Sequence, residues 1–397
     1  MGFFQDYRWV ILFYSTIILL VYIFRKKFDV HHKFLAMYRT KVGIKLMDKI
    51  GVKHSETVKL LGYIGIGVGY SGLVLIVYYL MKNLFNLLTV PTATSAISLV
   101  IPGVKIPGSP IMIPLITGWI ALFIVILVHE FSHGVVARAH KIPVKSSGIF
   151  FMGPLMGAFV EPEEKKLRKA SDTTQYSVYA AGPFSNVLLA MLCLFMLTYA
   201  FDPVLSSMST EVGVSVVGVT EGYPAMDAGL EGGMVITAVN DVSITNHAKF
   251  TETMQDIGPG EEITITTDSA VYDIVTVENP SDAKKGYIGI MASTKSKTEL
   301  NNQASYYKIL HRILMWLGEL MAITGLLSLG IGLANLLPLG PVDGGRMLQV
   351  SLEKIKGLET GESWWRKVSV ATLCLLAINI FWPVIKWVTG QIGKIFL

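Results

Sequence analysis

The sequence predicts an α-helical, multi-pass membrane protein that carries one inserted β-rich domain. Hydrophobic residues make up 52% of the 397 residues and charged residues only 16%, unlike the composition of a soluble domain. Six apolar stretches meet or approach the roughly 20 residues that a helix needs to cross a bilayer. After the fourth stretch the apolar runs stop, and short alternating strand patterns replace them until the fifth begins.

The six apolar stretches are expected to form transmembrane helices. The first is short, but it lacks the basic start and the small-residue cleavage site of a signal peptide, so we interpret it as a retained helix. The expected spans are Trp9–Phe24, Leu60–Met81, Pro114–Arg138, Tyr176–Ala200, Ile309–Leu337 and Val368–Gly390.

Lysine and arginine predict the orientation, because short loops rich in them stay on the cytoplasmic side. The loop Arg25–Lys59 is strongly basic, the loop Lys82–Ile113 holds only Lys82 and Lys105, and the loop after the third span is basic again. Both termini and the inserted domain are therefore expected outside. These cytoplasmic loops explain the net charge of +5, and no nucleic-acid partner is expected.

The inserted segment resembles a bacterial-type PDZ domain. The resemblance rests on "EGYPAMDAGLEGGMVITAVNDVSIT", with Gly233-Met234 where that family commonly has Gly-Asp. It implies a peptide ligand added as a strand at a sheet edge, with "GYIGI" (Gly286–Ile290) or "GVGV" (Gly213–Val216) as the carboxylate-binding loop. The alternative is a spacer that restricts access to the membrane region.

The chain is thereby divided into four regions. They are an N-terminal membrane region with two helices and a basic loop (1–112), a catalytic membrane region (113–200), the extracytoplasmic PDZ-like domain (201–307) and a C-terminal membrane region (308–397).

Two histidines and a glutamate interrupt the third span in the sequence "VILVHEFSHGVVAR". His129 and His133 are four residues apart, so a helix places both imidazoles on one face, and Glu130 follows the first of them. This is the HExxH pattern, in which two imidazoles bind zinc and the carboxylate takes a proton from a metal-bound water. Three polar groups at membrane depth are costly, which disfavours a passive role for the triplet.

A catalytic zinc site needs a third protein ligand and one open position. The fifth span ends in "ANLLPLGPVDGGRM", where Pro338 and Pro341 break the helix just before Asp343. Irregular backbone at membrane depth is tolerated only where protein or water covers it, so a cavity is expected there. The third and fifth spans run in the same direction, so both motifs are expected at the cytoplasmic side, at one depth.

The combination of HExxH with "NLLPLGPVDGG" resembles the site-2 protease family of intramembrane zinc metalloproteases. The resemblance implies one zinc ion per chain, held by His129, His133 and Asp343, with Glu130 as the general base. Members of that family often carry a PDZ domain at the place of the insertion. The absence of a long cysteine-rich insertion favours a prokaryotic plasma membrane.

Two further segments match the family. "AGPFSN" (Ala181–Asn186) resembles its small-residue motif, which implies that Asn186 holds the substrate backbone or the oxyanion. "GIFFMGPLMGAFVEP" resembles its re-entrant β-loop, which implies that the loop pairs with substrate and makes Gly148, Phe159 and Val160 candidates to contact it. Asn335 is a candidate to position the substrate, with a helix–helix hydrogen bond as the equal alternative.

The function expected from these features is hydrolysis of a peptide bond in or beside a transmembrane helix of a membrane-protein substrate. Two other classes stay open, namely a zinc-binding membrane transporter and a non-hydrolytic receptor that uses the PDZ-like domain to bind peptides. A transporter would favour polar residues spread along several spans, whereas here they concentrate in one HExxH and one Asp.

Overall fold

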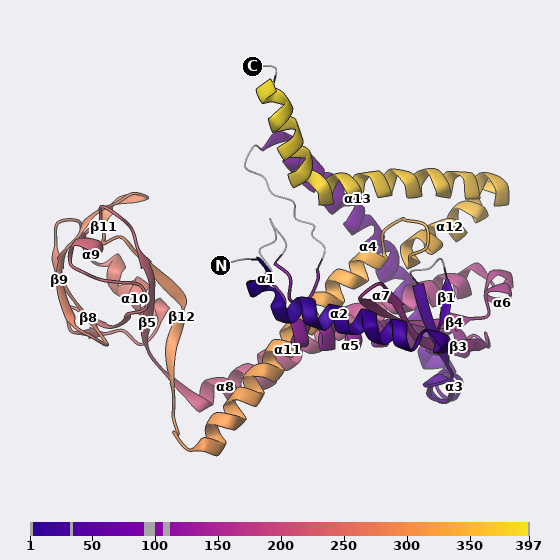
Figure 1. Ribbon diagram of the computed structural model, residues 1–397, viewed down its shortest axis with the longest axis horizontal. Helices are drawn as coiled ribbons and strands as arrows, with labels where there is room; N and C mark the ends of the chain where they lie inside the picture. Colours follow the sequence, from indigo (N-terminus) through magenta and orange to yellow (C-terminus); the bar gives the residue numbers. More distant parts are fainter. Residues whose placement is uncertain (1–2, 32–34, 91–99, 106–111, 396–397) are drawn as a thin grey trace. The chain divides into compact units, whose positions relative to one another are not determined.

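The computed structural model of the chain describes residues 3–31, 35–90, 100–105 and 112–395. The chain forms two compact units, one made of Met1–Leu197 with Leu317–Leu397 and the other of Thr198–Trp316. The first unit is mostly helical and the second is mostly β-strand (Figure 1).

Five helical segments in the described residues are long and apolar enough to cross a membrane. Many of their large apolar side chains are exposed, as expected for surfaces that face lipid. The third segment combines α7 (Asp172–Met196), a π-helical turn (Leu197–Phe201) and α8 (Asp202–Met208). The other four are α4 (Ser55–Thr89), α5 (Leu115–Ala139), α11 (Ser305–Asn335) and α13 (Leu358–Ile395).

The first of the six expected spans differs from this group. It forms α2 (Arg8–Ile23), whose 16 residues extend about 24 Å, short of the roughly 30 Å of a bilayer core. No residue of α2 is buried. The Tyr14 hydroxyl donates to the carbonyl oxygen of Pro102 at 3.0 Å and accepts from Trp119 Nε1 at 3.2 Å. Two short helices flank α2, namely α1 (Phe3–Asp6) and a 3₁₀ turn (Arg25–Lys27).

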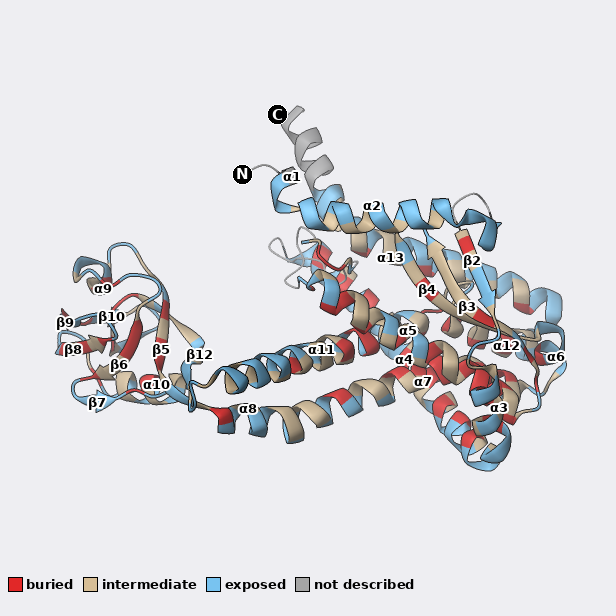
Figure 2. Ribbon diagram, turned by 60° about the horizontal axis from the view of Figure 1, so that its bottom comes forward, coloured by how far each residue is buried: buried red, intermediate tan, exposed pale blue. Residues whose placement is uncertain are grey.

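Glycines on α4 let this helix lie close to α7 and to α12 (Asp343–Lys356). A Cβ added at Gly65 would lie 3.3 Å from the Phe184 ring, and one at Gly69 would lie 2.9 Å from Met347 Cε. Small residues permit this approach of helix backbones in membranes. Figure 2 shows buried residues gathered where α4, α5 and α7 meet. The same packing holds α12 beside α7.

A four-stranded antiparallel sheet completes the first unit, in the order β1 (Asp29–His31), β2 (Leu35–Thr40), β3 (Val144–Met152) and β4 (Leu155–Pro162). The apolar segment expected to dip into the membrane forms the β3–β4 hairpin, in which Gly148 pairs with Phe159 and Ser147 with Val160. Within the described residues β4 pairs only with β3, so its other edge carries no strand. Helices α3 (Ile44–Lys53) and α6 (Glu164–Lys169) follow β2 and β4.

The second unit is built around a sheet with the path β12-β5-β6-β8-β9, so β12 (Ile290–Leu300) is an edge strand. Its core consists of alternating aliphatic side chains, among them Val214, Ile236, Ile263 and Ile265. The remaining elements are β5 (Ser209–Val219), α9 (Pro224–Asp227), β6 (Val235–Val239), β7 (Val242–Ser243), α10 (His247–Gln255), β8 (Glu262–Thr267), β9 (Val271–Val275), β10 (Val277–Asn279) and β11 (Asp282–Tyr287).

Candidate active site

Helix α5 presents His129 and His133 to the interior of the first unit. The two side chains are four residues apart on one helix face, and their Nε2 atoms lie 3.3 Å apart. Both residues are buried. Gly182 of α7 lies against them, since a Cβ added there would come within 2.5 Å of His129 Nε2. The small residue in "AGPFSN" therefore leaves room for the imidazole pair.

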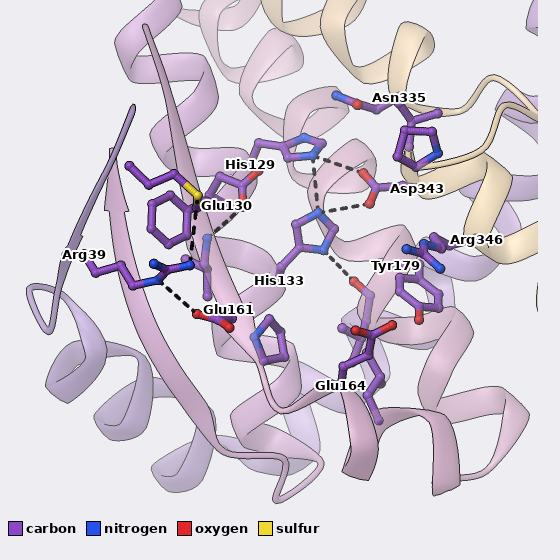
Figure 3. Close-up of a pocket in the computed structure, with 18 residues that line it drawn as sticks. Arg39, His129, Glu130, His133, Glu161, Glu164, Tyr179, Asn335, Asp343 and Arg346 are labelled. Atoms are coloured by element: carbon purple, nitrogen blue, oxygen red, sulfur yellow. Dashed lines mark hydrogen bonds and ion pairs between the residues drawn. The ribbon is translucent and has the colours of Figure 1, made fainter. Parts of the chain in front are cut away.

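Asp343 reaches the same point from the start of α12. Its Oδ2 atom lies 3.1 Å from His129 Nε2 and its Oδ1 atom lies 3.4 Å from His133 Nε2. Each of the three residues offers one ligand atom, and these atoms all lie within 4.8 Å of one another. The proline-containing segment between α11 and α12 turns the chain so that the carboxylate faces α5 (Figure 3).

The hydrogen bond of His133 suits a metal ligand. His133 Nδ1 lies 2.7 Å from the carbonyl oxygen of Val178, which can only accept, so Nδ1 carries the proton and Nε2 keeps its lone pair. The Oδ2 atom of Asp343 is buried and has no hydrogen-bond donor in the described residues. Two imidazole nitrogens and one carboxylate that converge in this way match the three-ligand set of a catalytic zinc site.

Glu130, which follows His129 on α5, contacts β4. Its Oε2 atom accepts a hydrogen bond from the backbone N–H of Val160 at 3.0 Å. Since successive residues of an antiparallel strand point their N–H groups to opposite edges, this N–H is directed to the edge of β4 that has no partner strand. The carboxylate therefore lies between the histidine helix and a free strand edge.

A cavity of about 540 Å³ contains these groups. Figure 3 shows His129, His133 and Asp343 converging on one side of it, with Glu130 beside β4. Among the other candidates from the sequence, Asn335, Phe159 and Val160 line this cavity. Gly148 lines a neighbouring cavity instead.

Asn186 is not among the residues that line either cavity. It is fully buried beside α11, where the Ser328 hydroxyl donates to its backbone carbonyl oxygen at 2.8 Å. Neither atom of its side-chain amide has a hydrogen-bond partner in the described residues. A buried amide without partners is uncommon and requires an explanation.

Several lining residues were not identified from the sequence, among them Arg346, Tyr179 and Arg39. Arg346 follows Asp343 by three residues and so shares its helix face, a spacing that could have revealed it. Tyr179 and Arg39 come from α7 and β2, and no local pattern marks them. Arg39 lies 3.7 Å from Glu161 and also pairs with Asp29, whereas the Arg346 guanidinium donates to the neutral side chain of Gln349 at 3.3 Å.

The second unit has its own cavity, of about 280 Å³, between α10 and the edge strand β12. Residues of "GYIGI" line it, together with Phe250 and Met254 of α10. The segment "GVGV" lies instead within β5, which pairs with β12 on one side and β6 on the other. Of the two candidate loops, only "GYIGI" therefore adjoins both a cavity and a sheet edge.

Comparison with known proteins identifies the family. The sequence pattern of peptidase family M50 matches residues 117–376. An uncharacterized protein of Methanocaldococcus jannaschii is 30% identical over 312 residues, which cover 77% of this chain and 74% of that protein. The zinc metalloprotease RasP of Shouchella clausii is 26% identical over 259 residues, 54% of this chain and 58% of RasP.

A solved PDZ domain, from the SdrC-like protein of Listeria monocytogenes, is 23% identical to this chain; the match covers 21% of this chain and 90% of that domain, with a TM-score of 0.19. The family pattern covers more than half of the chain, including the histidine helix and the segment that carries Asp343. The chain therefore belongs to peptidase family M50, the site-2 protease family, and is a zinc metalloprotease.

Proposed function

We propose that this chain is an intramembrane protease, which hydrolyses a peptide bond in or next to a transmembrane segment of a membrane protein. The observation that carries the proposal is the convergence of His129, His133 and Asp343 on a cavity between helices long and apolar enough to cross a membrane. A peptidase whose reacting groups lie among such helices is suited to substrates that are themselves in the bilayer.

His129, His133 and Asp343 would hold one zinc ion per chain. When bound, the zinc would lower the pKa of a coordinated water and polarise the scissile carbonyl. Glu130 would take up a proton at its carboxylate and return it to the leaving amine. The N–H of Val160 fixes the carboxylate in the wall of the cavity, so it is oriented before the substrate arrives.

The free edge of β4 supports binding of an unwound substrate backbone. A helix has satisfied its own backbone hydrogen bonds, so the substrate must open locally before a peptide bond can be attacked. The edge of β4 offers replacement partners by strand addition. Phe159 and Val160 then lie beside the substrate, and Asn335, which also lines the cavity, positions its backbone. The resemblance to the family supports a substrate-holding role for Asn186, which lies one helical turn beyond Gly182 and lines neither cavity.

The second unit binds peptides at its own edge strand. The cavity between α10 and β12 is lined mostly by apolar side chains and opens at the "GYIGI" loop. A peptide added to β12 would place an apolar side chain in this cavity. The charge pattern of the loops supports a prokaryotic plasma membrane with the protease site toward the cytoplasm and this unit outside.

The proposal is tested with the full chain in liposomes and a panel of single-span substrates. Wild type and Glu130→Gln are both expected to hold about one zinc ion, and only wild type is expected to cleave. Glu56→Gln is the matched control, since Glu56 is exposed and pairs with Lys59 away from the cavity. Cleavage by Glu130→Gln would exclude Glu130 as the base, whereas zinc binding without cleavage by wild type would favour a receptor.

A further inference from the structure

A second cavity adjoins the active site on the other side of Phe159 and Val160. It has a volume of about 310 Å³ and lies between the sheet and α5. Phe123, Leu127 and Phe131 line it from α5, spaced four residues apart on one helix face. With the exception of Glu130, its wall carries no ionisable carboxylate or amine in the described part of the chain.

Three residues line both cavities: Glu130, Phe159 and Val160. The apolar cavity therefore reaches the proposed general base, and the two cavities share Phe159 and Val160 of β4 as a wall. A group in the apolar cavity would lie beside the peptide bond that Glu130 serves. Because it shares wall residues with the active-site cavity, the apolar cavity is not an isolated void in the packing.

Gly148 keeps this space open. It pairs with Phe159 across the hairpin, and a Cβ at position 148 would overlap the backbone carbonyl oxygen of Tyr38 in β2 and lie 2.9 Å from the Phe159 ring. Glycine therefore lets β2 lie against β3 and the Phe159 ring lie over β3. A side chain at position 148 would displace β2 as well as the ring, and both cavities would change shape because Phe159 lines each of them.

We propose that this cavity is a specificity subsite that takes a large apolar side chain of the substrate, from a residue that adjoins the scissile bond. This inference rests on the proposed function and adds a substrate preference to it. Its volume is at the lower end of ligand pockets, roughly 300–1,000 Å³. An apolar cavity of this kind is filled favourably by an apolar group and poorly by water.

The occupant is a substrate side chain because the cavity is continuous with the active site. A substrate strand on the edge of β4 would run past Phe159 and Val160, and alternate side chains of a strand point to one face. One such side chain is thereby directed to the apolar cavity while the peptide bond faces Glu130. A single methylene in an apolar pocket changes specificity by roughly 10- to 200-fold, so the preference is measurable.

The test uses zinc-loaded full chain in liposomes and a designed single-span substrate. Each residue flanking the cleaved bond is replaced in turn by Ala, Leu or Phe. For wild type we expect one position at which Leu or Phe gives a kcat/KM at least about 10-fold above Ala. Leu127→Trp fills the cavity, so it should remove this preference by lowering kcat/KM for Leu and Phe while leaving Ala within about twofold.

Leu192→Trp is the matched control, because Leu192 is an exposed leucine of α7 that lines neither cavity. It should retain the wild-type preference. Equal rates for Ala, Leu and Phe at both flanking positions in wild type would overturn the subsite. The subsite is also overturned if Leu127→Trp slows all three substrates equally, a result that indicates a lipid-filled or structural space.

Binding is measured separately from turnover, so failure of the protease function and failure of the subsite can be told apart. A substrate with a photoreactive phenylalanine analogue at each flanking position is bound to Glu130→Gln and irradiated. Cross-links to Leu127 or Phe123 from one position support the subsite even if no cleavage is ever observed. Cross-links only to residues of the zinc-site cavity overturn it, whatever the activity of wild type.

Discussion

The backbone N–H of Val160 and the carboxylate of Glu130 are joined by a hydrogen bond of 3.0 Å. The proposed general base is thus held by the strand that is proposed to receive the substrate. A carboxylate that accepts a backbone N–H is oriented without the entropy cost of a flexible partner side chain. This relationship gives the first prediction.

Val160→Pro removes the only N–H that the structure shows on Glu130. Proline is tolerated at an edge strand where the N–H faces away from the sheet, so the β3–β4 pairing should persist. We expect the variant to retain zinc and to lose about 10-fold or more in kcat, because hydrogen bonds to charged groups contribute roughly 1.5–3 kcal/mol. Cleavage kinetics and metal analysis check this.

Val160→Ala is the control for the loss of the valine side chain. It keeps the N–H and should retain most of the wild-type kcat. Equal losses in the alanine and proline variants would show that the side chain, and not the hydrogen bond, matters at this position.

Removal of a proposed ligand should release the metal. His133→Ala and Asp343→Asn are expected to lower zinc from about one ion per chain to a small fraction of that, with loss of cleavage. His140→Ala is the control, since His140 lines neither cavity, and burial and, to a smaller extent, the charge of Lys59 lower its pKa. Zinc retained in both ligand variants would contradict the assignment.

Replacement of Asn335 or Asn186 should lower activity, and each variant has a second property that should stay unchanged. Asn335→Ala is expected to lower kcat/KM by about 10- to 100-fold with zinc retained, because the side chain lines the cavity. Asn186→Ala is expected to lower activity without loss of thermal stability, since its buried amide has no partner to lose in the described residues.

Ser328→Ala supplies the comparison for Asn186 at the same helix contact. Its hydroxyl is hydrogen-bonded, so its removal should cost about 1 kcal/mol of stability while activity per folded molecule is kept. A clear drop in thermal stability for Asn186→Ala, with activity unchanged, would assign Asn186 to helix packing alone.

The second unit should bind peptides that end in an apolar residue. Met254→Trp fills the cavity beside β12 and is expected to weaken such peptides by at least about 10-fold in a titration with the full chain. Val271→Trp changes an exposed residue of β9 that does not line the cavity and should leave binding unchanged. Identical peptide affinities for the two variants would argue against peptide binding in the cavity beside β12.

The membrane helices and the inserted β-rich segment could be predicted because hydrophobic runs and strand alternation are local properties. The placement of His129 and His133 followed from helix periodicity, and the break before Asp343 followed from the two prolines. The first expected span forms a helix of the predicted length, but it is too short to cross the bilayer core, since an apolar run shows where a helix forms and not whether it reaches across.

Other features depend on contacts that are distant in sequence. The basic loop after α2 contains β1 and β2, which become strands because they extend the β3–β4 hairpin. The hydrogen bond from Val160 to Glu130 joins residues 30 positions apart. The direction of the Asn186 side chain depends on how α7 is rotated against α11, which a motif does not specify.

The start of α12 also limits which substitutions this enzyme can accept. A Cβ at Gly344 would overlap the backbone of Leu336, and one at Gly345 would overlap the backbone of Leu339. Alanine at either position would push the helix away and carry the neighbouring Asp343 carboxylate with it. The mutational tolerance of this segment is therefore set by backbone clearance, and a single added methyl group is enough to disturb the position of the ligand.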